Sequence, residues 1–273
     1  MEDLSGWASA IEAELRAIGS PWLDRAAVLA ETDSTQDAAA RLAGRRPGLV
    51  VIAGRQARGR GRLGRDWFQR GDLGLAMTAV IEPSIPPERL SLAAGVAIAL
   101  ALEQLAPACG ALGLRWPNDL VEATPRPGGG RKLGGILIEV QGGLALVGIG
   151  LNLNQRTEDF PGPLRPHAVS LASLALPQGA PAWPRLEVVL AVLRALSRAL
   201  SLGPEAVVAA WSARDVLTGS EQTFIHDGRE VRGRVERLAP TGHITLALPD
   251  GGTAELPALA TSLKHAALSA GPE

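Results

Sequence analysis

The sequence predicts an α+β protein: a mixed β-sheet with flanking helices, followed by a small C-terminal β-barrel. Strand-like and helical apolar runs follow one another up to about residue 215, and two of them flank Gln141-Gly142-Gly143 as a hairpin. From Val216 the pattern changes to short polar–apolar alternation. Turn signals at HDGRE, APTGH and PDGGT there divide about 50 residues into five short strands. We therefore expect two domains, 1–215 and 216–273.

The N-terminal segment predicts a helix and then a strand. Apolar side chains recur at spacings of four, four and three, as on one face of an amphipathic helix: Trp7, Ile11, Leu15 and Ile18. Residues 26–31 predict a short buried strand.

A second helix is predicted over 34–44, with Ser34 as N-cap, Asp37 in the capping position three residues later and Gly44 at its end. The β-branched run 48–54 predicts a buried strand that leads directly into an arginine-rich loop.

The middle of the chain predicts two strands around a buried helix. The strands are expected over 73–81 and 112–116, and the helix over 86–105 is apolar on nearly every face. The PRPGGG stretch at 125–130 predicts a flexible turn. After the hairpin, three further helical segments are expected: 168–175, 184–202 and 204–213.

Composition narrows the class of protein. Apolar residues make up 46% and charged residues 20%, and the net charge is −1, as in an ordinary globular protein rather than a dedicated nucleic-acid binder. The single cysteine, Cys109, favours a reducing cytoplasm. The acidic start, Met1-Glu2-Asp3, does not resemble a signal peptide, and no apolar run of about 18 residues predicts a membrane span.

Lysine and asparagine are scarce. Of 27 basic residues only Lys132 and Lys264 are lysines, and the three asparagines are Asn118, Asn152 and Asn154. This bias lowers the significance of any single arginine and raises that of each lysine and asparagine.

The arginine loop RQARGRGRLGRDW, 55–67, combines five arginines, three glycines and Trp67. Glycine backbones and guanidinium groups together suit a phosphate or carboxylate, and a tryptophan can stack on a planar heterocycle. From composition alone, a solvated basic loop or an RNA-contacting segment explains these residues as well as a ligand-binding loop does.

Three further segments carry the scarce residues. In RWPNDL a predicted strand ends at Pro117 and presents Asn118 and Asp119, which suit a nucleotide and Mg²⁺ or simply a turn. RKLGGILIE places Lys132 before two strand glycines, which indicate a close backbone approach. GIGLNLN places Asn152 and Asn154 on one face of a strand.

Five motifs in this order, DSTQ, GRGRLGRDW, RWPND, KLGGILIE and GIGLNLN, resemble those of biotin protein ligases, the biotin–[acetyl-CoA carboxylase] ligases. The resemblance is close over 30–155, and the segment 216–265 is similar in position and size to the family's SH3-like module. It implies a class II synthetase-like catalytic domain and an SH3-like β-barrel.

The resemblance also implies an activity. Such a ligase activates biotin with MgATP to biotinyl-5′-AMP and passes the biotinyl group to a lysine of a biotin carboxyl carrier domain of acetyl-CoA carboxylase. Its substrates and cofactors are biotin, ATP and Mg²⁺. Exposed sheet edges would permit a homodimer.

Carried onto this sequence, the family's motifs imply a set of site residues. The biotin site would be lined by Ser34, Thr35, Gln36, Gln56, Arg60, Gly61, Arg62 and Lys132. The ATP site would comprise Arg62, Arg65, Trp67, Asn118, Asp119, Lys132 and Asn152, with Trp67 on adenine and Asn152 near the sugar. The catalytic residues would be Lys132, Arg62 and Asp119, with Asp119 also meeting the metal through ATP.

The sequence departs from the family pattern at two places. Gln36 replaces the asparagine of Ser-Thr-Asn, so the role of this position is open. The segment between Asp119 and Lys132 is longer than usual, with PRPGGG as a surface insertion. Only about 25 residues precede the core, so we expect no helix-turn-helix domain and no DNA-binding function.

Two alternatives remain beside a biotin ligase. A lipoate–protein ligase shares the architecture and the adenylation chemistry. A non-enzymatic RNA-binding protein is disfavoured by a pI near 6.5 and an aromatic content of 3%.

Overall fold

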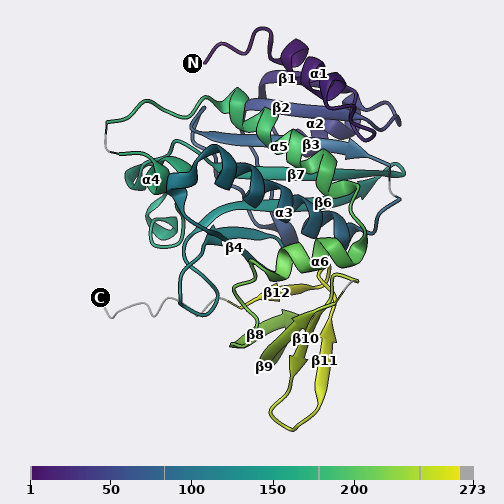
Figure 1. The fold of residues 1–273 in the computed structure, drawn as a ribbon, viewed down its shortest axis with the longest axis vertical. Coiled ribbons are helices and arrows are strands. Elements are labelled where there is room, and N and C mark those ends of the chain that lie inside the picture. The colour runs from purple at the N-terminus through teal and green to yellow at the C-terminus, as the bar shows by residue number, and fades with distance from the viewer. Residues whose placement is uncertain (1, 83, 178, 240, 265–273) are drawn as a thin grey trace.

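The protein is described by a computed structural model, which covers residues 2–82, 84–177, 179–239 and 241–264. A seven-stranded mixed sheet forms its centre, in the order β1-β2-β3-β7-β6-β5-β4 (Figure 1). Only β1 and β2 are parallel; every other neighbouring pair is antiparallel. The strands are β1 Arg25–Thr32, β2 Leu49–Gln56, β3 Gly74–Ile81, β4 Leu112–Arg115, β5 Asp119–Glu122, β6 Lys132–Gln141 and β7 Leu144–Asn152.

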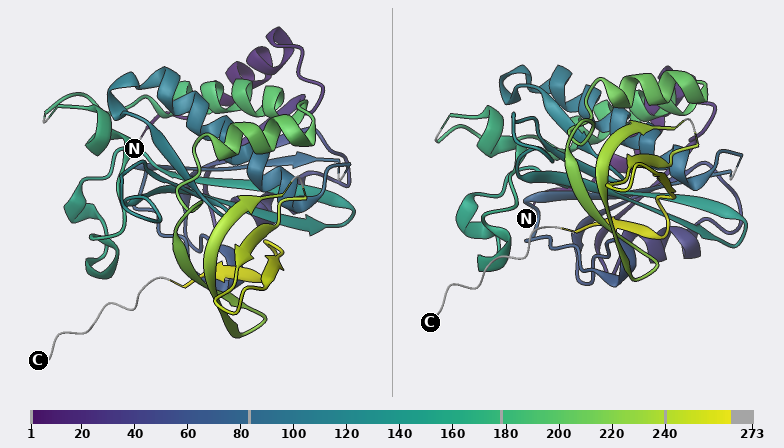
Figure 2. Two further views of the ribbon diagram at one scale, coloured as in Figure 1. Left: turned by 60° about the horizontal axis from the view of Figure 1, so that its bottom comes forward. Right: turned by 90° about the horizontal axis from the view of Figure 1, so that it is seen from below.

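Helices cover both faces of this sheet (Figure 2). Successive side chains of β2 point to opposite faces of the sheet and so belong to two hydrophobic cores. Val50 and Ile52 lie in the larger core, with α1, α3, α5 and α6, whereas Leu49 and Val51 lie in the smaller core, with α2. Burial on both faces explains why β2 and β3 are apolar without alternation. The helices are α1 Trp7–Ala17, α2 Thr35–Leu42, α3 Pro87–Leu105, α4 Leu171–Ala175, α5 Arg185–Leu200 and α6 Pro204–Ser212.

A second, antiparallel sheet of five strands lies at the C-terminal end, in the order β11-β10-β9-β8-β12. Trp116, just after β4, packs edge-on against Phe224, with ring centroids 5.7 Å apart, and its Nε1 donates to the carbonyl of Gly242 at 3.0 Å. These contacts fix the second sheet against the first. Its strands are β8 Glu221–His226, β9 Arg229–Leu238, β10 Ile244–Ala247, β11 Thr253–Leu256 and β12 Thr261–Leu263.

The structure confirms the α+β architecture and the five C-terminal strands. It does not close those strands into a barrel, because no pairing joins β11 to β12 in the part of the chain that is described. The predicted C-terminal domain extends to residue 273, but residues 265–273 lie outside the described chain.

Two local predictions are wrong, and one strand was missed. The strand over 26–31 is an edge strand and only half-buried, since β1 has a neighbour on one side. Asp37 does not cap α2 but pairs with Arg60. The strand predicted over 112–116 does end where expected, as β4, but the chain then turns into β5, which pairs with β4 and was not predicted. Within the described residues, no helix is long and apolar enough to cross a membrane.

Candidate active site

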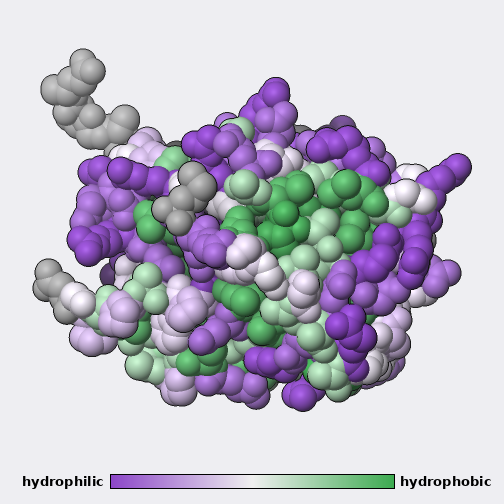
Figure 3. All heavy atoms as spheres, turned by 90° about the horizontal axis from the view of Figure 1, so that it is seen from above, coloured by the Kyte–Doolittle hydropathy of each residue, from purple (hydrophilic) through white to green (hydrophobic). Residues whose placement is uncertain are grey.

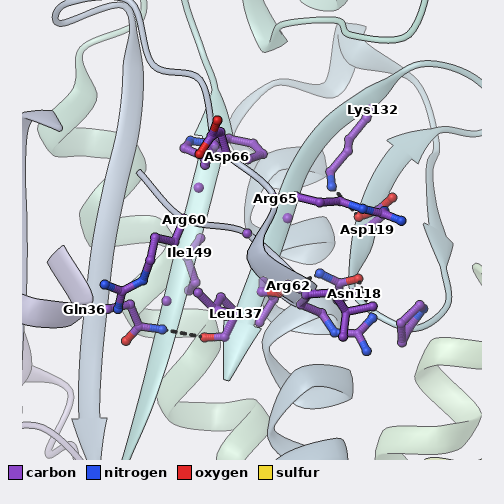
Figure 4. A pocket seen from close by; sticks show the side chains of 18 of the residues that line it. Gln36, Arg60, Arg62, Arg65, Asp66, Asn118, Asp119, Lys132, Leu137 and Ile149 are labelled. Atoms are coloured by element: carbon purple, nitrogen blue, oxygen red, sulfur yellow. Dashed lines mark hydrogen bonds and ion pairs between the residues drawn. The ribbon is translucent and has the colours of Figure 1, made fainter. Parts of the chain in front are cut away.

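A cavity opens on the α2 face of the sheet, between the arginine loop and strands β6 and β7 (Figure 4). It brings together every predicted site residue except Asn152: Ser34, Thr35, Gln36, Gln56, Arg60, Gly61, Arg62, Arg65, Trp67, Asn118, Asp119 and Lys132. The segments that carry them are far apart in sequence and converge because α2, the loop and the hairpin share this face. Ser262 and Leu263 of the C-terminal sheet also line the cavity.

The floor of the cavity is made of glycines. A Cβ at Gly148 would lie 2.7 Å from Gln36 Nε2, and one at Gly150 would lie 2.5 Å from the Trp67 ring. Gly135, paired with Gly150, is overlaid by Lys132 and Trp67. The close approach predicted from strand glycines is confirmed, and the approaching groups are side chains of the site.

One end of the cavity is closed and polar. Gln56 Oε1 accepts from both the backbone N–H of Thr35, at 2.8 Å, and its hydroxyl, at 3.0 Å, and Thr78 donates to the same hydroxyl. Gln36, 3% exposed, donates through Nε2 to the carbonyl of Leu137 at 2.9 Å. This bond fixes the amide orientation, since a carbonyl only accepts.

The same arrangement leaves a specific set of groups for a ligand. Gln36 Oε1 is buried and has no hydrogen-bond partner among the described residues. The Ser34 hydroxyl accepts from the Gln36 N–H and retains its own proton for donation. The closed end therefore offers both an acceptor and a donor, and a buried acceptor left unpaired is costly.

The arginines of the loop divide into two groups. Arg55 and Arg58 form exposed ion pairs with Glu31 and Asp33, which agrees with the interpretation of a solvated basic surface. Arg60, predicted to line the biotin site, does reach the cavity.

The Arg60 guanidinium is held by two carboxylates. It bonds both oxygens of Asp37, at 2.6 and 2.8 Å, and Glu139 at 3.1 Å. Hydrogen bonding to Asp37 is the main cause of a raised Arg60 pKa. These contacts anchor the loop to α2 and β6.

Arg62 points the other way, toward the C-terminal sheet. Its guanidinium donates to the carbonyls of Ala258 and Thr261, the latter at 3.0 Å, and approaches Asn118 Oδ1 at 3.5 Å. Burial lowers the pKa of Arg62, and repulsion from Arg65 adds to this effect. Arg62 is half-buried and Arg65 exposed, and both line the cavity, so their two guanidinium groups suit an anionic ligand there.

Asp119 lies at the other end of the cavity, between two cations. Lys132 Nζ is 2.5 Å from one carboxylate oxygen and Arg115 Nη2 is 3.0 Å from the other. Burial alone would raise the pKa of Asp119, but attraction to Lys132 and Arg115 outweighs it and holds the pKa below its ordinary value. The carboxylate is therefore ionised at neutral pH.

The fit of Mg²⁺ to this end is limited. Both oxygens of Asp119 already face cations, and no cluster of three metal-ligating side chains occurs among the residues described. Mg²⁺ is commonly held by one or two carboxylates together with substrate phosphates. These residues do not form a metal site by themselves, so a magnesium ion here would have to be held mainly by the phosphates of a nucleotide.

A second cavity of about 890 Å³ continues from the first beyond Trp67 and Lys132. Lys132 Nζ lies 5.7 Å from the Trp67 ring centroid, within cation–π range. Asn152 lies here, although its Nδ2 already donates to the carbonyls of Lys132 and Val169. Asn154 is past the end of β7 and bonds Trp183 instead.

Sequence reasoning missed Arg115. It borders both cavities, is 12% exposed and contacts Asp119. Arg115 is the first residue of the RWPNDL motif. Because arginine is abundant in this chain, nothing in the sequence singles this one out, and its partners become visible only in the folded structure.

Fold and site together define a class: an α+β protein with a cavity lined by lysine and arginine side chains on one face of a mixed sheet, bordered by an arginine loop. The model of the biotin/lipoate A/B protein ligase family matches residues 27–155. A biotin–[acetyl-CoA-carboxylase] ligase of Mycobacterium tuberculosis is 32% identical over 251 residues, covering 85% of this chain and 86% of its own length. The chain belongs to this family, on its biotin protein ligase side.

Other relatives match over less of their length. The bifunctional ligase/repressor BirA of Bacillus subtilis is 35% identical over 152 residues, which is 52% of this chain and 44% of that protein. The chain thus spans less than half of such a relative. Among solved structures, the biotin protein ligase from Aquifex aeolicus in complex with biotin and ATP has a TM-score of 0.76 and 27% identity, covering 88% of this chain and 99% of the other.

Proposed function

We propose that the protein activates biotin with MgATP to biotinyl-5′-AMP and transfers the biotinyl group to a lysine of a carrier protein. In the first step a biotin carboxylate oxygen forms a bond to the α-phosphorus, and the bond to the β-phosphate oxygen breaks to release pyrophosphate. In the second step the carrier amine attacks the acyl carbon, and AMP leaves.

The observation that carries this proposal is the pairing of a closed polar end with a cationic end in one cavity. Biotin has the matching shape, with a cyclic urea at one end and a carboxylate at the other. Gln36 Oε1 and the Ser34 hydroxyl are the acceptor and donor that a urea N–H and carbonyl require. The dithiolane ring of lipoate has no N–H group, so it would leave Gln36 unpaired.

The first step brings a carboxylate to a phosphate, so two anions must approach. Lys132, at the junction of the two cavities, lies where both would be held. Arg62 and Arg65 add positive charge from the loop. Preorganised donors of this kind contribute about 3–4 kcal/mol each when removed one at a time.

The nucleotide fits the second cavity. Trp67 offers a stacking surface for adenine between the two cavities, and apolar side chains line the far wall: Phe160, Leu164, Pro166 and Ala168. Asn152, a buried residue that lines this cavity, would contact the sugar region by releasing one of its present bonds: its Nδ2 donates to two backbone carbonyls and its Oδ1 accepts from Gln155. Magnesium supplies phosphate charge neutralisation when bound, next to Asp119.

In the second step Lys132 would stabilise the oxyanion that forms when the carrier amine attacks. The arginine loop covers the adenylate and limits its hydrolysis, because water is excluded beneath it. This loop is tied down by Arg60 at one side and Arg62 at the other.

The names of two relatives support the proposed acceptor. Proteins of Mycobacterium tuberculosis and Paracoccus denitrificans, 32% and 34% identical, are named biotin–[acetyl-CoA-carboxylase] ligases. By analogy, the acceptor of this chain is a biotin carboxyl carrier domain of acetyl-CoA carboxylase, in the cytoplasm.

The catalytic unit comprises residues 1–215 and the C-terminal unit 216–273, a division supported by the two separate sheets.

A homodimer through a sheet edge is part of this proposal. β1 is the upper edge of the large sheet in Figure 1. Figure 3 looks onto this side of the molecule, where apolar side chains gather near the centre and hydrophilic ones surround them. Analytical ultracentrifugation with and without biotin and ATP tests this state; a monomer under both conditions would contradict it.

The decisive experiment is incubation with ATP, Mg²⁺, biotin and a carrier domain, read as a biotinyl mass increase on the carrier lysine. Omission of ATP is the control. A thermal-shift comparison of biotin with lipoate separates the two ligases: we expect stabilisation by biotin alone. Stabilisation and transfer with lipoate, but not with biotin, would assign the other chemistry.

A further inference from the structure

The PRPGGG segment joins the active site through Arg115. One nitrogen of this guanidinium, Nη1, donates to the carbonyl of Gly128 at 3.1 Å, and the other, Nη2, reaches Asp119 at 3.0 Å. Asp119 in turn pairs with Lys132. A continuous chain of contacts therefore runs from the loop to the lysine at the junction of the two cavities.

The loop is itself fixed on its other side. The N–H of Gly128 donates to the carbonyl of Val216, at 2.9 Å, in the linker that precedes the C-terminal sheet. The same linker pairs with β4, where Leu114 donates to Arg214 and accepts from Val216. Gly128 is buried between the linker and Arg115, so its carbonyl has a defined position.

The glycines make this close packing possible. Gly128 and Gly129 have φ values of 86° and 73°, which L side chains rarely adopt. A Cβ at Gly129 would lie 2.8 Å from Val121, and one at Gly130 would lie 2.8 Å from Glu122. The glycine half of the insertion therefore lies against β5, whereas residues 125–127 are exposed.

We propose that the 125–130 loop is a positioning element of the site: the Gly128 carbonyl orients Arg115, and Arg115 holds the Asp119 carboxylate that places Lys132. Arg115 is thus a positioning residue that acts through Asp119. The proposal rests on the proposed function for its catalytic consequence, but the placement of Lys132 can be measured without turnover.

The two lysines of the chain give that measurement directly. Lysine labelled with ¹³C at Cε yields one signal from Lys132 and one from Lys264, which lies on the C-terminal sheet side and pairs with Glu230. In Arg115→Met we expect the Lys132 signal to shift or broaden and the Lys264 signal to stay unchanged. Arg214→Met is the matched control, since Arg214 is a half-buried arginine near the linker that pairs with Glu103 and not with Asp119.

Turnover tests the role of the loop. Gly128→Pro removes the bond to Val216 and cannot keep a positive φ, so it displaces the Gly128 carbonyl. We expect Arg115→Met and Gly128→Pro each to lower kcat for biotin-dependent pyrophosphate release about 10- to 100-fold, as for a misplaced catalytic group. KM for biotin should change little, since the closed end of the cavity is untouched.

The double variant separates positioning from general damage. If Gly128 acts through Arg115, the two changes affect one contact, and the double variant falls no further than Arg115→Met alone. Multiplicative losses, or a Lys132 signal unmoved in Arg115→Met, would overturn the proposal. Wild-type protein that makes no biotinyl-AMP would contradict the proposed function instead, while the lysine signals would still test the placement of Lys132.

Discussion

The ammonium group of Lys132 lies 2.5 Å from the Asp119 carboxylate, at the point where two cavities of the protein meet. In the proposed reaction, this pair would place a compact positive charge where the biotin carboxylate and the α-phosphate approach each other. Arg115 also pairs with Asp119. Lys132 can therefore move from Asp119 to a ligand oxygen without leaving the buried carboxylate unpaired.

Lys132→Ala should abolish adenylate formation and leave the fold intact. Removing the only lysine at the cavity junction takes away the charge that offsets the repulsion between carboxylate and phosphate, at a cost of about 10²–10³ in kcat or more. Pyrophosphate release measures this loss. Lys264→Ala, which changes the only other lysine, is the control and should release pyrophosphate at the normal rate.

Arg62→Ala or Arg62→Gly should release biotinyl-AMP into solution. The guanidinium of Arg62 joins the arginine loop to Thr261 and Asn118, so its loss loosens the cover over the adenylate. Free biotinyl-AMP is measured by chromatography after filtration. Arg58→Ala, at a highly exposed position of the same loop, should retain the adenylate; equal leakage from both variants would contradict this role.

Trypsin should cut the arginine loop more slowly when biotin is bound. The segment Arg58–Arg65 contains four arginines and is held to the rest of the protein mainly by side-chain contacts. A ligand beneath it adds contacts that favour the closed state. Equal cleavage rates with and without biotin would rule out ligand-dependent ordering of the loop, and lipoate serves as the negative control.

Gly150→Ala should weaken ATP binding and leave biotin binding nearly unchanged. The new Cβ would lie 2.5 Å from the Trp67 ring and must displace it. Loss of an aromatic stack on adenine costs about 1–3 kcal/mol, so KM for ATP should rise about tenfold. Gly203→Ala is a suitable control because a Cβ there meets no atom closer than 3.9 Å.

Stability should depend on pH through Asp119. Its pKa in the folded protein lies below the ordinary value of 3.8, so its contribution is present above that value and is lost as pH falls through the lower folded-state pKa. The difference in unfolding free energy between wild type and Asp119→Asn should therefore shrink on acidification below about pH 4. Denaturant unfolding from pH 6 to pH 3 measures it; a difference that grows toward acid would contradict the assignment.

Much of the architecture could be predicted because the periodic apolar pattern is strong. The long apolar run over 86–105 is typical of a buried helix, and it forms α3. The two apolar runs on either side of Gly142 are typical of a hairpin, and they form β6 and β7. All predicted site residues except Asn152 also meet in one cavity, since the motifs lie on segments that the sheet brings to one face. Their individual roles remain predictions.

What could not be predicted depends on long-range partners. Asp37 has a suitable spacing for a cap, but a guanidinium 23 residues later offers a stronger partner than a backbone N–H. Arg115 is one arginine among many until Gly128 and Asp119 are seen beside it. The half-exposure of β1 follows from the strand order, which local pattern does not contain.

The glycine floor sets how the cavity can change over evolution. At positions 135, 148 and 150 the space that a side chain would fill is already taken by Lys132, Gln36 and Trp67. A larger residue at any of these positions pushes aside a side chain that lines the cavity. Variation in ligand preference must therefore come from the overlying side chains and the loop, while the strands beneath tolerate almost no change in volume.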